Sequence, residues 1–136
     1  MLRIRFFIFF FASINITAHA GCFDLIEAPP TQLSGVLRMV VFPGRPNYSS
    51  VEEGDEPEKT YIFRLDKPIC STDQALLFDQ VHLVSMSHTR SGMKGLIGKY
   101  VQVQLTEQMP AITGHHHAPL VAWVQEVHRV RRNLTH

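Results

Sequence analysis

The sequence predicts a mostly β protein, a small OB-like five-stranded barrel with one short helix between strands three and four. Residues 100–106 alternate apolar and polar side chains, which is the period of a strand with one buried face. Four other segments have a similar character. Between the third and fourth of these strands, apolar residues at positions 93, 96 and 97 have the spacing of a short helix. The order of three strands, one helix and two strands is that of an OB-type barrel.

Local residue preferences give the expected bounds of these elements. Gly35 falls on the apolar face of the first strand, a position typical of a bend or a bulge. Pro68 is expected to end the second strand, since proline cannot donate to a β ladder. Ser91 is expected to cap a helix over residues 92–97, which Gly98 would end. The predicted strands are residues 33–42, 61–65, 81–86, 100–106 and 120–130.

The first twenty residues have the three parts of a secretory signal peptide. A short basic segment is followed by the apolar run 6–12, and the segment ends in Ala18-His19-Ala20, the small-x-small form that signal peptidase accepts. The apolar run is too short to span a membrane. We therefore expect residues 1–20 to be removed, leaving one OB-like domain over residues 21–136. This predicts a periplasmic or secreted protein with no stable membrane insertion after cleavage.

The charge of the expected mature chain disfavours nucleic acid as a partner. Removal of Arg3 and Arg5 leaves eleven basic and twelve acidic residues, so no net positive field remains to hold a phosphate backbone. The cluster of Arg129, Arg131 and Arg132 is typical of a solvated chain end.

The chain has two cysteines, Cys22 and Cys70, and both lie in the expected mature domain. In an oxidising compartment an even pair is most simply one disulfide. Lipidation of Cys22 is an alternative, but His19 stands where a lipoprotein signal has an aliphatic residue. Metal ligation or a catalytic thiol is a further alternative, which no Cys-x-x-Cys spacing supports.

Two predicted loops mark the regions where function is expected. Residues 43–60 form the longest break in the pattern and contain five acidic residues, while residues 107–119 contain three adjacent histidines. In an OB-type barrel the connections between strands one and two and between strands four and five bind ligands, and these two loops are those connections. The acidic loop could be merely solvated. It lacks the residue spacing of a calcium-binding loop.

The three adjacent histidines allow several kinds of site. In an extended segment His115 and His117 point to one face and His116 to the other, so the first two could bind zinc or copper. A third ligand could come from His82, from His88 or from an acidic residue of loop 43–60. Alternatively, the imidazoles could hydrogen-bond to neighbouring groups and hold the loop without any metal. Catalytic acid–base use lacks a nucleophile beside a base, which acyl transfer needs.

Five short motifs are similar to those of a known family. They are Phe42-Pro43-Gly44-x-Pro46-Asn47-Tyr48, Gly54-Asp55-Glu56-Pro57-Glu58, Leu65-Asp66-Lys67-Pro68-Ile69-Cys70, Leu96-x-Gly98-Lys99-x-Val101 and Thr113-Gly114-His115-His116-His117-x-Pro119. Through them the chain resembles the small secreted bacterial proteins classed as domain of unknown function 4431. The resemblance spans about residues 22–128, and within the single domain the family-like C-terminal part is about residues 81–130. It implies a Cys22–Cys70 disulfide and export, and it brings no established activity.

The functional prediction is an exported binding or interaction module. It would contact an envelope protein, a peptide or a glycan through loops 43–60 and 107–119. The second hypothesis is a periplasmic metal-binding protein that uses His115 and His117, and the third is an enzyme; no catalytic residue is assigned. The predicted binding residues are Asn47, Tyr48, His115, His116 and His117.

Overall fold

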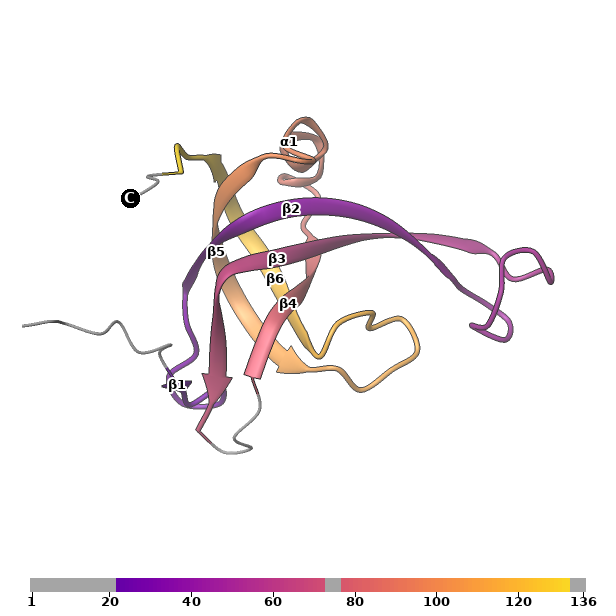
Figure 1. Cartoon of the computed structure of the whole chain (residues 1–136), viewed down its shortest axis with the longest axis horizontal. Helices are drawn as coiled ribbons and strands as arrows, with labels where there is room; N and C mark the ends of the chain where they lie inside the picture. The colour runs from indigo at the N-terminus through magenta and orange to yellow at the C-terminus, as the bar shows by residue number, and fades with distance from the viewer. Residues whose placement is uncertain (1–21, 73–76, 133–136) are drawn as a thin grey trace, which may run out of the picture.

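The computed structural model describes residues 22–72 and 77–132, so the predicted signal peptide lies outside the described residues. The described chain is mostly strand, with one short helix (Figure 1). Its elements are β1 (Cys22–Phe23), β2 (Gln32–Pro43), β3 (Pro57–Ser71), β4 (Leu77–Ser85), α1 (Arg90–Gly95), β5 (Tyr100–Pro110) and β6 (Leu120–Arg129).

Strands β2 to β6 close into a five-stranded barrel. Around the barrel β2 pairs with β3, β3 with β4, β4 with β6, β6 with β5, and β5 with β2 again. The β4–β6 pair is parallel and the other four are antiparallel. With α1 between β4 and β5, this arrangement confirms the predicted OB-like barrel and the place of its helix.

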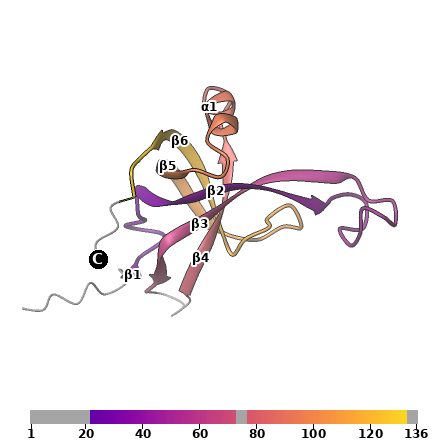
Figure 2. The same ribbon diagram turned by 45° about the horizontal axis from the view of Figure 1, so that its top comes forward.

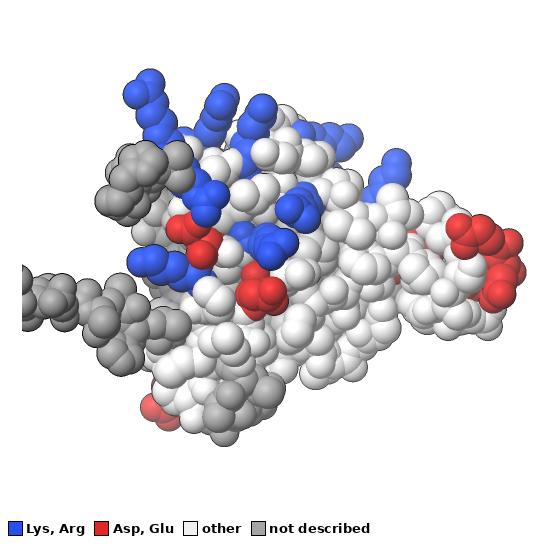
Figure 3. Space-filling view, in the orientation of Figure 1, with Lys and Arg blue, Asp and Glu red and all other residues white. Residues whose placement is uncertain are grey.

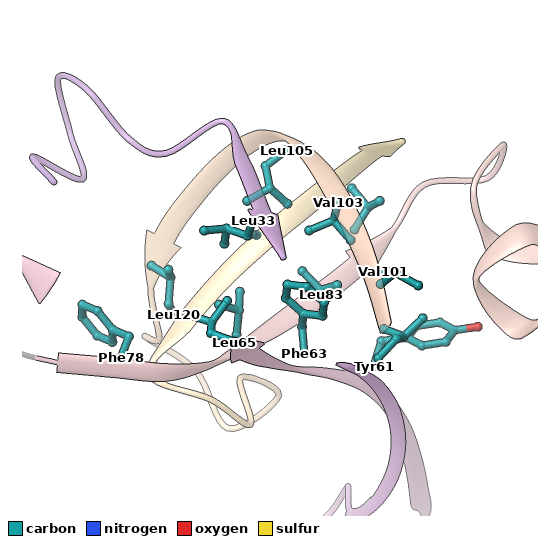
Figure 4. Packing of buried hydrophobic residues seen from close by; sticks show 14 of the residues in the cluster. Leu33, Tyr61, Phe63, Leu65, Phe78, Leu83, Val101, Val103, Leu105 and Leu120 are labelled. Carbon is teal, nitrogen blue, oxygen red and sulfur yellow. The ribbon is translucent and has the colours of Figure 1, made fainter. Parts of the chain in front are cut away.

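One apolar face of each strand fills the barrel, as the alternation predicts. Val101, Val103 and Leu105 of β5 are buried, and so are Tyr61 and Phe63 of β3. They meet residues of the other strands in one cluster (Figure 4). Burying a large apolar side chain stabilises the fold by about 1.5–3 kcal/mol, so this cluster supplies the barrel's main stabilisation.

The two predicted cysteines form a disulfide. Cys22 and Cys70 are bonded, with their Cα atoms 4.4 Å apart. The bond lies beside the parallel pairing of β1 with β3, in which Cys22 is the register partner of Cys70. The short strand β1 was not predicted, and the disulfide holds it against the barrel. No helix among residues 22–72 and 77–132 is long and apolar enough to cross a membrane.

The expected end of the second strand at Pro68 is wrong. Strand β3 continues through Pro68 to Ser71. Its pairing with β4 shifts register between Arg64 and Ile69, and a proline can occupy such an irregularity because no ladder hydrogen bond is needed there.

The expected helix bounds and the cap at Ser91 are also wrong. Helix α1 begins at Arg90, after Thr89, and ends at Gly95. The Thr89 hydroxyl donates to the Met86 carbonyl oxygen at 3.1 Å, so it does not cap the helix. Gly98 follows with a positive φ of 78°, a conformation that favours glycine.

Gly35 lies where β2 and β3 come very close. A Cβ atom at this position would be 2.1 Å from the carbonyl oxygen of Arg64. Only glycine therefore fits there, which explains the glycine on the apolar face of the strand.

The β2–β3 hairpin extends beyond the barrel as a two-stranded arm (Figures 1 and 2). Within the described residues, positions 38–43 of β2 pair only with β3, and positions 57–60 of β3 pair only with β2. We call these two segments the arm and residues 44–56 the arm tip. Val41, expected on the buried face, is 53% exposed because it lies on the arm.

Both functional loops are shorter than predicted. β3 begins at Pro57 and β5 continues to Pro110, so the connections are residues 44–56 and 111–119. We call residues 111–119 the histidine loop. It lies on the opposite side of the arm from α1 in both views (Figures 1 and 2).

Candidate binding surface

The arm tip is organised around the carboxylate of Asp55. This side chain accepts backbone N–H groups from Asn47 at 2.8 Å, Ser49 at 2.7 Å and Ser50 at 3.0 Å. These three bonds lower the pKa of Asp55, because they favour its charged form. Asp55 is only 4% exposed. One member of the predicted acidic cluster therefore has an internal role and holds the tip in a fixed shape.

The base of the tip is closed by backbone hydrogen bonds. The Gly44 N–H donates to the Glu56 carbonyl at 2.7 Å, and the Glu56 N–H donates to the Arg45 carbonyl at 2.8 Å. Tyr48 then takes a φ of 56°, in the left-handed region that non-glycine residues seldom occupy. Residues in this region persist where surrounding contacts hold them, and Tyr48 has such contacts.

Tyr48 and Glu58 hold His115 from both sides. The Tyr48 hydroxyl lies 2.8 Å from His115 Nε2, and His115 Nδ1 lies 2.9 Å from Glu58 Oε2. A neutral imidazole has one N–H, so the geometry fits a hydroxyl that donates to Nε2 and an Nδ1–H that donates to the carboxylate. We call Tyr48, His115 and Glu58 the clasp. It joins the arm tip, the histidine loop and the arm.

Gly114 of the histidine loop lies against the Tyr48 ring. A Cβ atom at Gly114 would be 3.5 Å from the Tyr48 ring, and the rings of Tyr48 and His115 meet edge to face with centroids 5.1 Å apart. The two loops in which function is expected therefore meet at one end of the barrel.

His117 packs against the arm. Its ring stacks on Phe42, with centroids 4.1 Å apart and planes 2° from parallel. Its Nε2 lies 3.6 Å from Glu58 Oε2, and its backbone N–H donates to His82 Nδ1 at 3.3 Å. His115 and His117 thus turn toward the same carboxylate. The chain does so through a turn, in which the His116 N–H donates to the Thr113 carbonyl, and not through the extended segment that was expected.

His116 turns away from Glu58. Its Nδ1 accepts the Ile112 backbone N–H at 3.0 Å, which holds the histidine loop to itself. Its ring meets that of His82 edge to face, with centroids 6.2 Å apart. Each of the three histidines therefore has a structural contact.

The cluster shifts the titration of two groups. Burial, together with charge repulsion from the neighbouring His117 and His116, lowers the pKa of His82 to about 4. Burial acts to raise the pKa of Glu58, but the hydrogen bonds and charges of His115 and His117 together outweigh it, so this pKa is lowered overall. At neutral pH the cluster therefore contains a neutral His82 and an ionised Glu58.

The metal hypothesis finds no assembled ligand set in the described part of the chain. No group of three His, Cys, Asp or Glu residues within it could hold a metal ion. Both ring nitrogens of His115 already have partners, and His88 bonds to the carbonyl of Gln125 at 3.2 Å. Zinc or copper binding by His115 and His117 stays a prediction.

The clasp has the order hydroxyl, imidazole, carboxylate, which is the order of a nucleophile, its base and an orienting acid. The same contacts also fix a strained tip against the histidine loop, and that role alone accounts for all three side chains. An enzymatic role stays a prediction.

The exposed part of this surface is acidic and partly aliphatic. Glu52, Glu53 and Glu56 are exposed on the arm tip, and Figure 3 shows acidic side chains gathered at the end of the arm. Val51 is 38% exposed, and Ile112 of the histidine loop is 71% exposed. Exposed apolar and charged groups together are what a protein partner can contact.

The structure brings the predicted binding residues together and adds two. Tyr48, His115 and His117 meet at Glu58, while Asn47 lies in the tip with its N–H bonded to Asp55. Sequence reasoning missed Glu58 and Phe42 as named site residues. Glu58 was one acidic residue among several in loop 43–60, and only the register Phe42↔Glu58 shows that both face the histidine loop.

The fold and surface together define a small, disulfide-bonded, OB-like β-barrel with a projecting arm. No family model, no curated protein and no solved structure matches the chain. The family resemblance of its motifs stays a prediction.

Proposed function

We propose that this protein is an exported binding module whose arm tip and histidine loop together contact a protein or peptide of the bacterial envelope. The observation that carries the proposal is the clasp, in which His115 connects Tyr48 of the tip to Glu58 of the arm. A surface fixed before binding loses less conformational entropy when a partner docks. The clasp and the Asp55 hydrogen bonds fix this surface.

The chemistry of the tip supports a partner that carries positive charge. Its exposed carboxylates are Glu52, Glu53 and Glu56, and they lie beside the exposed aliphatic Val51. Carboxylates repel polyanionic glycans and attract Lys and Arg side chains. A protein or peptide is therefore favoured over an acidic glycan.

The disulfide supports export, because such bonds persist in oxidising compartments. The predicted signal peptide supports it independently. We accordingly place the protein in the periplasm or outside the cell.

Site-specific photocrosslinking in the bacterium that produces the protein tests this function. A photoreactive phenylalanine replaces Glu53 of the tip in one variant and Asp79 of the barrel in a matched control, since both positions are exposed. We expect a discrete adduct from position 53 and none of that size from position 79. Equal adduct patterns from both positions, or no adduct from position 53, would contradict the proposal.

A further inference from the structure

The face of the arm toward α1 has a groove that the proposed function does not use. Three cross-strand neighbours, Met39, Tyr61 and Leu83, line it. Leu83 and Tyr61 are buried, and Figure 4 shows Tyr61 at the end of the core cluster, whereas Met39 is half-buried. The apolar row therefore runs out of the core onto the arm, along a groove with a volume of about 370 Å³.

This groove is separate from the clasp. Successive residues of a strand point to opposite faces of a sheet. Phe42 and Glu58 of the arm contact the histidine loop and alternate with Met39 and Tyr61 along β2 and β3. His82 of β4 lies between the two sides, since it borders the groove and also accepts the His117 N–H. The groove row and the clasp thus lie on opposite faces of the arm (Figure 2).

Three cations surround the apolar row. Lys59, Arg90 and Lys94 line the groove, all three are exposed, and no carboxylate is among the residues that line it. Within the described residues, none of the three forms a salt bridge. Figure 3 shows Lys and Arg side chains along the edge of the molecule where α1 lies. An occupant with carboxylates and apolar side chains would be complementary to this groove.

The edge of β2 at Met39, which lines the groove, is open. Leu37 makes the last hydrogen bonds of β2 toward β5: its N–H donates to the Lys99 carbonyl at 3.2 Å, and its carbonyl accepts the Gly98 N–H at 2.7 Å. By the strand period, the backbone groups of Met39 and Val41 point to the same edge. In the described chain no strand pairs with that edge beyond Leu37. Such an edge can accept an added strand.

We propose that this groove binds an extended acidic segment of a partner protein, which adds as a strand along Met39 to Val41. Its carboxylates would face Arg90 and Lys94, and its apolar side chains would cover Met39 and the exposed Val41. Neither the arm tip nor the last described residues of this chain have that chemistry. The arm tip is a closed turn rather than an extended segment, and residues 129–132 are basic.

Fluorescence anisotropy with two peptides tests the proposal. The probe is a fluorescein-labelled hexapeptide of alternating glutamate and valine, and its control has lysine in place of glutamate. We expect the glutamate peptide to bind, with an affinity that falls as salt is added, and the lysine peptide not to bind. The Arg90→Glu/Lys94→Glu variant should weaken binding by about tenfold or more. Lys67→Glu, a matched charge reversal outside the groove, should leave it unchanged.

A second pair of variants tests strand addition. Val41→Pro removes an N–H from the open edge and should weaken binding by about tenfold, whereas Val41→Thr keeps that N–H and the branched side chain and should bind nearly as wild type. Because Val41→Pro could perturb the fold, amide exchange of the wild type provides a separate measurement. The peptide should slow exchange at Met39 and Val41.

Three results would overturn the proposal. The first is no binding of the glutamate peptide, or equal binding of both peptides. The second is binding that depends on Arg90 and Lys94 without protection of the two edge amides, which would indicate an anion site and no added strand. The third is self-association of the protein that the same charge reversal abolishes, which would identify a second copy as the occupant.

Discussion

Acid should lower the free energy of unfolding of this protein, and the pKa of His82 determines by how much. The folded protein lowers the pKa of His82 from 6.5 to about 4, so folding favours the neutral ring. The unfolded chain then binds more protons between these values. The stability that a neutral His82 provides is therefore complete above pH 6.5 and is lost as the pH falls toward 4.

The size of this effect follows from the shift. For a site shielded from solvent, linkage gives a loss of about 2 kcal/mol at pH 5. His82 is half-buried, so solvent reduces this value, and we expect about 1–2 kcal/mol. Glu58 adds to the loss only below its ordinary value of 4.5, since its pKa is also lowered.

Urea unfolding at several pH values between 5 and 8 measures this loss. His82→Asn keeps an acceptor for the His117 N–H and removes the titration, so its stability should change less over this range. His128→Asn is the matched control, because His128 is exposed on β6 and its profile should follow the wild type. A wild-type stability that is constant from pH 7 to 5, or an equal slope for His82→Asn, would refute the reasoning.

Three further predictions concern the clasp, the metal hypothesis and the disulfide. Tyr48→Phe keeps the ring and removes one hydrogen bond to His115, so thermal melts should show a loss of about 1 kcal/mol; an unchanged melting temperature would contradict the clasp. Changing both His115 and His117 to Ala should lower stability by about 1–3 kcal/mol. Calorimetric titration of the wild type with zinc should show only weak binding, and a tight stoichiometric site that this variant loses would prove that expectation wrong. Reducing the Cys22–Cys70 bond, which closes a separation of 48 residues, should cost about 4 kcal/mol in urea unfolding; equal midpoints with and without reductant would exclude that contribution.

The sequence alone predicts the barrel because its strands obey simple alternation. Val101, Val103 and Leu105 lie inward, with Gln102 and Gln104 between them, and the order of elements then limits the topology to an OB-like barrel. The cysteines could be paired because two cysteines in a chain that is expected to be exported most simply form one disulfide.

The strand ends could not be predicted because the arm lies outside the core. Residues 57–60 form a strand only through pairing with β2. Their charged and polar side chains lack the alternation of apolar and polar residues that predicts a strand. Pro68 is expected to end the strand from its residue type alone. The register shift that accommodates it arises from the pairing with β4. Local patterns cannot reveal either effect, since both arise from the partner strand.

The candidate site was only half accessible to sequence reasoning. Tyr48 and the histidines stood out as unusual residues in two loops of known function in this fold. Glu58 joins them through cross-strand register and not through any motif of its own. Glu58 is an ordinary acidic residue in the sequence, so its contact with the histidines can be recognised only from the structure.

The central claim is that the clasp organises the surface through which this protein binds. Photocrosslinking from position 53 in a Tyr48→Phe/His115→Gln background tests it most directly, because neither change touches the crosslinking position. The account predicts that the discrete adduct formed in the otherwise wild-type protein is lost or strongly reduced while the barrel stays folded. An adduct of undiminished yield from a protein with a broken clasp would contradict it.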